Sequence, residues 1–184
     1  VAVAVAIQPD GKIVVVGLST TDNSIDTRVV VRYNPNGSLD TTFGGGTGIF
    51  RFTANAGAPK APVYDVAIQS DGKIVVVGAD AGSGFELARD WVIFRFNPNG
   101  TYDTSFGGNG RLVTDFGGTA NEAAHTVSIL PDGKILVAGR KGYISNADER
   151  LQDFALVRYN ANGTLDNTFG GIDGRVITDF SGGA

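Results

Sequence analysis

The sequence predicts an all-β protein that consists of three similar units, each folded as a four-stranded antiparallel sheet. Three observations predict this. The tripeptide Asp-Gly-Lys recurs at residues 10–12, 71–73 and 132–134, with a constant spacing of 61 residues. An Arg–aromatic–Asn step and a Phe-Gly-Gly step each recur three times, with a spacing of 63 residues. Short apolar runs lie between these turn signals, and none has the 3.6-residue period of an amphipathic helix.

The first two strands of each unit form a tight hairpin. In the first copy, residues 3–8 (VAVAIQ) alternate in side-chain size, as a first strand does. Asp10 and Gly11 then supply the positive φ angles that a two-residue hairpin needs. Residues 13–17 (IVVVG) are an unbroken apolar run and give the second strand.

The third and fourth strands follow a second turn signal. Residues 29–33 (VVVRY) form the expected third strand, and Asn36-Gly37 is a hairpin signal that predicts a turn from strand three into strand four. The Phe-Gly-Gly segment leads on to residues 48–52 (GIFRF). The other two copies repeat this order.

The second and third strands are apolar at successive positions, so both faces of each sheet must be covered. Repeated four-stranded units with two covered faces are typical of β-propeller blades. We therefore expect a β-propeller-like fold with blades at residues 1–61, 62–122 and 123–184. Stacked sandwich units or a β-solenoid are the alternatives. Because propellers typically have four to eight blades, we expect either a part of a larger propeller or a homodimer.

The strings VAIQxDGKIVVVG and RFNPNGTYDTSFGGNGRLVTDF resemble the bacterial delta-60 repeat, and are more distantly similar to blades of NHL-type propellers. The resemblance covers essentially the whole chain. The first copy departs from it at Thr27, where the other copies have Asp90 and Asp153. The resemblance implies an extracellular or surface-exposed bacterial protein, often large and multi-domain, usually without an assigned activity.

Composition excludes several classes of function. A net charge of −4 argues against nucleic-acid binding, which needs a basic face. No apolar stretch approaches the ~20 residues that span a membrane, so we expect no membrane insertion. The chain has no cysteine, which excludes disulfides and thiolate sites. His125 is the single histidine, and no serine pattern predicts a catalytic triad around it, so we expect no enzyme.

Two motifs could indicate a ligand-binding site, one for phosphate and one for calcium. The Gly-rich segments would need a following helix to bind phosphate, whereas a strand follows each of them. The phrase NPNGSLD at residues 34–40 offers oxygen ligands for calcium, but its Gly is fourth and no Glu follows, unlike an EF-hand loop. We expect Asn34 and Asp40 to shape the turn. The expectation is therefore no cofactor, with calcium as the open alternative.

Charged residues recur at one place in each copy. An Arg ends the third strand and an Asp follows the Asn-Gly turn, namely Arg32, Arg95 and Arg158 with Asp40, Asp103 and Asp166. A cross-strand ion pair in each blade, worth about 0.2–1 kcal/mol, explains both. A feature present in every blade belongs to the scaffold, whereas a ligand site breaks the symmetry.

The asymmetric segments between the second and third strands are therefore the better functional candidates. They differ in length, charge and aromatic content, as loops adapted to a partner do. Trp91 aligns with Phe154 and is expected to pack inside a blade. The predicted partner-binding residues are Phe85, Arg89, Tyr143, Asp148, Glu149 and Arg150.

The leading hypothesis is a non-enzymatic propeller segment that presents these loops to a protein or glycan at a bacterial cell surface. One alternative is a structural spacer in a large secreted protein. A propeller hydrolase or lyase is the other, and it would need acids or histidines from several blades near the central axis.

Overall fold

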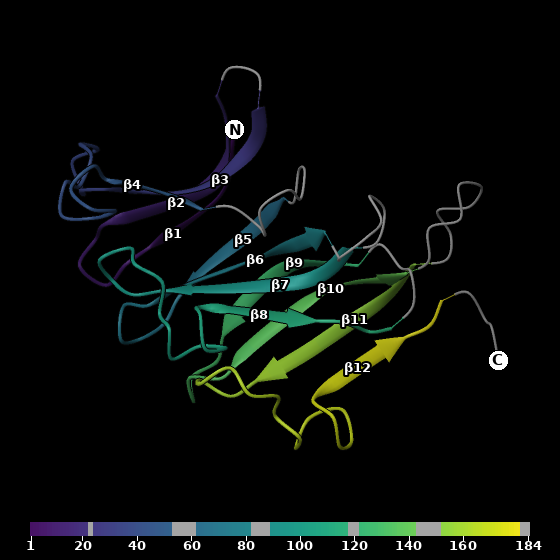
Figure 1. Cartoon of the computed structure of the whole chain (residues 1–184). Helices are drawn as coiled ribbons and strands as arrows, with labels where there is room; N and C mark the ends of the chain where they lie inside the picture. The colour runs from purple at the N-terminus through teal and green to yellow at the C-terminus, as the bar shows by residue number, and fades with distance from the viewer. Residues whose placement is uncertain (22–23, 53–61, 82–88, 118–121, 143–151, 181–184) are drawn as a thin grey trace.

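The computed structural model describes residues 1–21, 24–52, 62–81, 89–117, 122–142 and 152–180. These residues form an all-β structure of three four-stranded antiparallel sheets, in which each strand pairs with its neighbours in sequence. The three sheets lie side by side (Figure 1). We call them blades 1, 2 and 3 in chain order. The fold is β-propeller-like, as the sequence predicts.

Each blade has three longer strands and a short fourth one. Blade 1 contains β1 (Ala2–Ile7), β2 (Ile13–Thr21), β3 (Ser24–Tyr33) and β4 (Ile49–Phe52). Blade 2 contains β5 (Val63–Ile68), β6 (Ile74–Ala81), β7 (Arg89–Phe96) and β8 (Arg111–Thr114). Blade 3 contains β9 (Ala123–Ile129), β10 (Ile135–Gly142), β11 (Gln152–Tyr159) and β12 (Arg175–Thr178).

Two apolar cores lie between neighbouring blades. In the middle strand β6, Val75 and Val77 pack toward blade 3 and Val76 packs toward blade 1, and all three are fully buried. The successive apolar residues that the sequence shows in this strand thus serve two cores. Each blade has a forward face, turned toward the next blade along the chain, and a rear face, turned toward the previous one.

The Asn-Gly turn differs from the expected hairpin. Asn36-Gly37 closes on a single bridge between Tyr33 and Leu39, and β4 begins only at Ile49. One further backbone bond follows the bridge, from the N–H of Asp40 to the carbonyl of Arg32 at 3.0 Å. The fourth strand is the segment after Phe-Gly-Gly.

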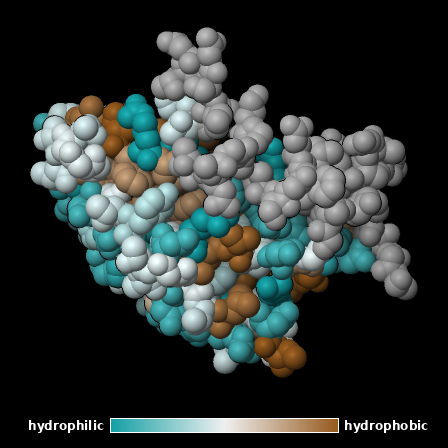
Figure 2. Space-filling model, in the orientation of Figure 1, coloured by the Kyte–Doolittle hydropathy of each residue, from teal (hydrophilic) through white to brown (hydrophobic). Residues whose placement is uncertain are grey.

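The surface is mixed in character. On the face shown in Figure 2, hydrophobic side chains lie in separate groups among hydrophilic ones. None of the described segments forms a helix long and apolar enough to cross a membrane.

Candidate functional site

The structure places one of the predicted partner-binding residues. Arg89 begins β7 and is half-buried, and its carbonyl accepts a hydrogen bond of 2.8 Å from the backbone N–H of Glu122. The other predicted residues lie outside the described residues: Phe85, Tyr143, Asp148, Glu149 and Arg150. Trp91 is fully buried, as expected, and its Nε1 donates to the carbonyl of Arg140 at 2.9 Å.

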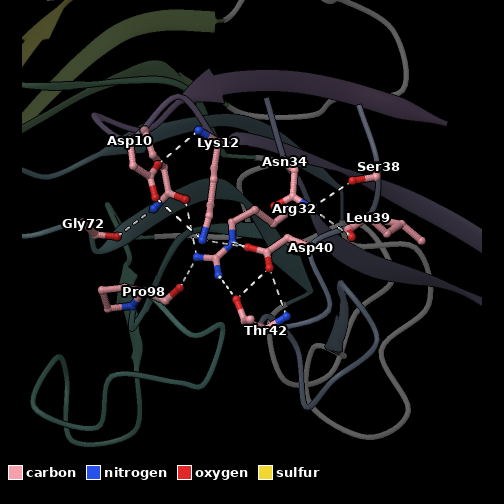
Figure 3. A network of polar contacts seen from close by, with 11 residues as sticks. Asp10, Lys12, Arg32, Asn34, Ser38, Leu39, Asp40, Thr42, Gly72 and Pro98 are labelled. Atoms are coloured by element: carbon pink, nitrogen blue, oxygen red, sulfur yellow. Dashed lines mark hydrogen bonds and ion pairs between the residues drawn. The ribbon is translucent and has the colours of Figure 1, made fainter. Parts of the chain in front are cut away.

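The recurrent Arg and Asp form the predicted ion pair, and they do so in a buried network (Figure 3). Arg32 Nε donates to Asp40 Oδ2 at 2.7 Å, and both side chains are almost fully buried. Lys12, from the Asp-Gly-Lys turn, lies 3.1 Å from the same oxygen. Thr42 donates its backbone N–H and its hydroxyl to Asp40 Oδ1. We call this network, together with the Phe43 ring below Arg32, the clasp.

The clasp also joins blade 1 to blade 2, which the sequence does not reveal. Arg32 Nη1 donates to the carbonyl of Pro98, in the Asn-Gly turn of blade 2. The Phe43 ring is fully buried against Gly100 of that turn, where a Cβ would lie 2.7 Å from the ring. Gly44 N–H donates to the Asn99 carbonyl at 3.0 Å. The Asn-Gly turn of one blade is therefore the docking point for the clasp of the previous one.

Blade 2 repeats this arrangement toward blade 3. Arg95 Nε donates to Asp103 Oδ2 at 2.7 Å, and its Nη1 donates to the carbonyl of Ala161. Phe106 is fully buried against Gly163. The Arg–carbonyl and Phe–Gly contacts recur one blade further on, which indicates that the clasp belongs to the scaffold.

The clasp holds its carboxylates ionised. The hydroxyl of Thr42 and the cations Lys12 and Arg32 hold the pKa of Asp40 well below its usual range, although burial opposes this. Burial alone would raise the pKa of Asp103, but hydrogen bonds from Ser105 and the charge of Arg95 outweigh it and the pKa is lowered. Groups of this kind maintain structure and are poor proton acceptors at neutral pH.

The Asn side chains of residues 34–40 form hydrogen bonds within the Asn-Gly turn. Asn36 Oδ1 accepts hydrogen bonds from the backbone N–H and hydroxyl of Ser38 at 3.0 and 2.7 Å. Asn34 Nδ2 donates to the Ser38 hydroxyl at 3.0 Å and to the Leu39 carbonyl at 3.3 Å. Two of these four bonds join a side chain to the backbone, as is typical of turns, and the other two join side chains within the turn.

The chain belongs to the β-propeller family described as a domain of unknown function (DUF5122). The family's sequence model matches residues 8–43, 69–106 and 130–169, which together are more than half of the chain. Each match ends at the Phe of a clasp and includes its Lys, Arg and Asp. No curated protein matches the chain.

A second polar cluster lies away from the clasps, where blade 2 meets blade 3. Asp90 is on β7, Asp115 follows β8 and Glu122 precedes β9. Their carboxylates present oxygens that all lie within 4.8 Å of one another, a spacing that could hold a metal ion. We call these three residues the carboxylate group.

Glu122 is the buried member of the carboxylate group. Its side chain is 1% exposed, and its Oε2 accepts a hydrogen bond from the backbone N–H of Phe116 at 3.1 Å. Its Oε1 is buried and has no hydrogen-bond partner among the described residues. Burial, together with the negative charges of Asp90 and Asp115, raises the pKa of Glu122 to about 7. Burial and Asp115 also raise the pKa of Asp90.

The sequence did not predict the carboxylate group, because its three members are spread over 32 residues of the chain, from Asp90 to Glu122. One signal was available. The corresponding positions of the first copy are Thr27, Thr53 and Ala61, none of which is acidic. The three acids are therefore missing from the first copy, whereas the third copy repeats the two aspartates as Asp153 and Asp179.

Asp103→Asn is expected to destabilise the protein by about 3–5 kcal/mol at pH 7, because it leaves the buried Arg95 guanidinium without its counter-charge. Urea unfolding measures this, with the exposed Asp71→Asn as control, expected within about 1 kcal/mol of wild type. Since the pKa of Asp103 is lowered in the folded state, its contribution is complete above the unfolded pKa near 4 and is lost at lower pH. Equal losses in the two variants would contradict a clasp role.

Glu122→Gln is expected to remove a pH dependence of stability. Because folding raises the pKa of Glu122 to about 7, the folded state binds more protons than the unfolded state between about pH 4.5 and 7. The free energy of unfolding of the wild type therefore falls as the pH rises through this range. The variant should lose this component, as unfolding at pH 5, 6, 7 and 8 would show. Parallel pH profiles of the two proteins would contradict the assigned environment.

Proposed function

We propose that the chain is a non-enzymatic binding module of a secreted or cell-surface bacterial protein, and that its partner is a protein or a glycan. The partner would contact the variable segments 82–88 and 143–151, which the sequence places between the second and third strands of blades 2 and 3. The delta-60 resemblance of the sequence supports the bacterial surface, and the carboxylate group supports the position of the site.

The carboxylate group carries this proposal because its buried member, Glu122, has an unsatisfied oxygen. Every recurrent charged residue in the clasps of blades 1 and 2 has partners that explain its presence as scaffold. By contrast, the carboxylate group occurs once among the described residues, and Glu122 Oε1 lacks a partner. An unpaired buried carboxylate oxygen is costly unless something else satisfies it.

Calcium is the cation we propose for the carboxylate group. Carboxylate oxygens are the ligands that calcium prefers, and a divalent ion would offset both the burial and the weaker mutual repulsion that raise the pKa values of Glu122 and Asp90. In the sequence, Asp90 follows the variable segment 82–88 by two residues. An ion held there would fix the end of that segment and prepare the edge for a partner.

One feature supports a non-enzymatic role. The aspartates of the clasps have lowered pKa values, which suit structural ion pairs better than general-base chemistry.

Calcium is expected to raise the melting temperature of the wild type by about 5–10 °C when it is present at about 100 times its dissociation constant. The double variant Asp90→Asn with Glu122→Gln should lose this shift. Asp10→Asn with Asp132→Asn removes two exposed carboxylates near the clasps and should retain it. The ion site is disproved if the wild type shows no shift, or if the Asp90/Glu122 variant shows the same shift.

Shortening residues 143–151 to a two-glycine turn is expected to abolish binding to a glycan array and to a panel of immobilised extracellular-matrix proteins. A circular dichroism spectrum like that of the wild type would show that the blades remain folded. Binding that persists after the shortening would place the partner elsewhere. If the wild type binds no member of either panel, the spacer hypothesis is favoured over the binding module.

A further inference from the structure

The connection between β8 and β9 is the place where blade 2 joins blade 3, and its described residues are 115–117 and 122. Phe116 packs edge-on against Trp91 of β7, with ring centroids 5.0 Å apart. Arg175 of β12 donates to the Asp115 carbonyl at 3.0 Å, and its guanidinium lies 5.2 Å from the centre of the Phe116 ring. Both blades therefore hold the segment that follows β8.

Glu122 joins the same point from the side of blade 3. Its Oε2 accepts a hydrogen bond from the Phe116 N–H at 3.1 Å, and its own N–H donates to the Arg89 carbonyl at 2.8 Å. Its Oε1 is buried and has no partner among the described residues. The Asp90 carboxylate also makes no hydrogen bond or ion pair within that part of the chain. Two carboxylates at this junction thus keep oxygen atoms without a protein partner, and one of them is buried.

The junction between blades 1 and 2 differs, because the protein itself supplies the cations there. Arg28 occupies the position that Trp91 has in blade 2, and its Nη2 donates to the Ala79 carbonyl at 2.8 Å. The same nitrogen lies 3.4 Å from Asp80 Oδ1, and Arg111 donates to Asp80 Oδ2. The buried acid at this junction therefore has two guanidinium partners, which offset the cost of burying its charge.

The junction between blades 2 and 3 has three acids and no such cation. Oxygen atoms of Asp90, Asp115 and Glu122 all lie within 4.8 Å of one another, and no Lys or Arg of the described segments forms an ion pair with them. Lys141 stands where blade 2 has Asp80, and it acts on Glu122 only as a weak, longer-range charge. A divalent ion among the three carboxylates would receive one ligand from β7, one from the residue after β8 and one from the residue before β9.

We propose that the cation at the carboxylate group is a lock between blades 2 and 3: it binds Asp90 and Asp115 of blade 2 and Glu122 of blade 3 together, and so holds β9 against blade 2. The lock rests on the calcium site proposed above, and it gives that site a second effect, on the whole of blade 3. The junction between blades 1 and 2 needs no ion, because Arg28 and Arg111 are part of the chain.

The number of protein ligands sets the affinity that the lock can have. Calcium takes about six to eight oxygen ligands, so three carboxylates leave several positions to water. Extracellular calcium modules have dissociation constants on the order of 10⁻⁴–10⁻³ M, and we expect this range here. The ion would therefore be bound in calcium-rich surroundings and lost where calcium is scarce, which fits the cell-surface location proposed for the chain.

Terbium luminescence measures binding at the site separately from the lock. Terbium shares the oxygen preference of calcium, and a nearby indole transfers excitation energy to it. Trp91 is the only tryptophan and directly follows Asp90, so excitation of Trp91 should give terbium emission that falls when calcium displaces the ion. Asp115→Asn should weaken binding by at least about tenfold, because it removes one charged ligand. Asp153→Asn changes the counterpart of Asp90 in blade 3 and should leave binding within about twofold.

Hydrogen exchange measures the lock itself. Because repeat proteins open between neighbouring units, blade 3 can separate from blade 2 while blades 1 and 2 stay packed. This opening releases the ion, so calcium at about ten times its dissociation constant should slow the exchange of β9 and β10 amides about tenfold. Amides of β2 and β3 should change less than about twofold. Asp115→Asn should remove the effect in blade 3, and Asp153→Asn should retain it.

The two measurements separate the lock from the ion site. No terbium emission, or emission that calcium does not displace, would disprove the ion site and the lock with it. Binding without slower exchange in β9 and β10 would overturn the lock and leave the ion site intact. Equal slowing in all three blades would also overturn the lock, because the ion would then stabilise the chain as one unit. Slowing that persists in Asp115→Asn would overturn the arrangement in which the ion joins the end of β8 to blade 3.

Discussion

The guanidinium at the end of each third strand is the interaction on which the rest of the structure depends. Arg32 and Arg95 each bind an aspartate of their own blade, a carbonyl of the next blade and the face of a buried Phe. A guanidinium suits this position because it directs several donors in a fixed plane and stays charged when buried. Each blade is thereby tied to the next through the Asn-Gly turn, and the apolar cores form between blades held in this register.

The two edges of the blades differ in how their charged groups are used. The edge with the clasps repeats the Arg–Asp ion pair in every blade, so its charged groups bind one another. The carboxylate group lies away from this edge, and its members Glu122 and Asp90 have raised pKa values. A rigid, repeated edge allows the opposite edge to differ between blades without loss of the fold, which is how repeat proteins commonly acquire binding surfaces.

The sequence predicts the blades well because their signals are local. Asp10-Gly11 predicts a hairpin. The apolar run Val75, Val76 and Val77 predicts a strand that is buried on both faces. The function of Arg32 is only half predictable: the spacing to Asp40 indicates an ion pair, but the Pro98 carbonyl lies 66 residues away and has no side-chain signature. The role of Glu122 is harder to predict from the sequence, because Asp90 and Asp115 come close to it only when blades 2 and 3 pack together. The segments with the predicted aromatic anchors, Phe85 and Tyr143, lie outside the described residues.

Hydrogen exchange in Arg95→Lys tests most directly whether the guanidinium couples neighbouring blades. Lysine keeps the charge beside Asp103 but cannot reach the Ala161 carbonyl with a second donor at the same time. Backbone amides of β9, β10 and β11 should then exchange faster than in the wild type, while those of β1, β2 and β3 keep their protection. Equal loss of protection in all three blades would contradict the account, because the substitution would then destabilise the whole chain. No loss in blade 3 would also contradict it, because the ion pair would then act within its own blade alone.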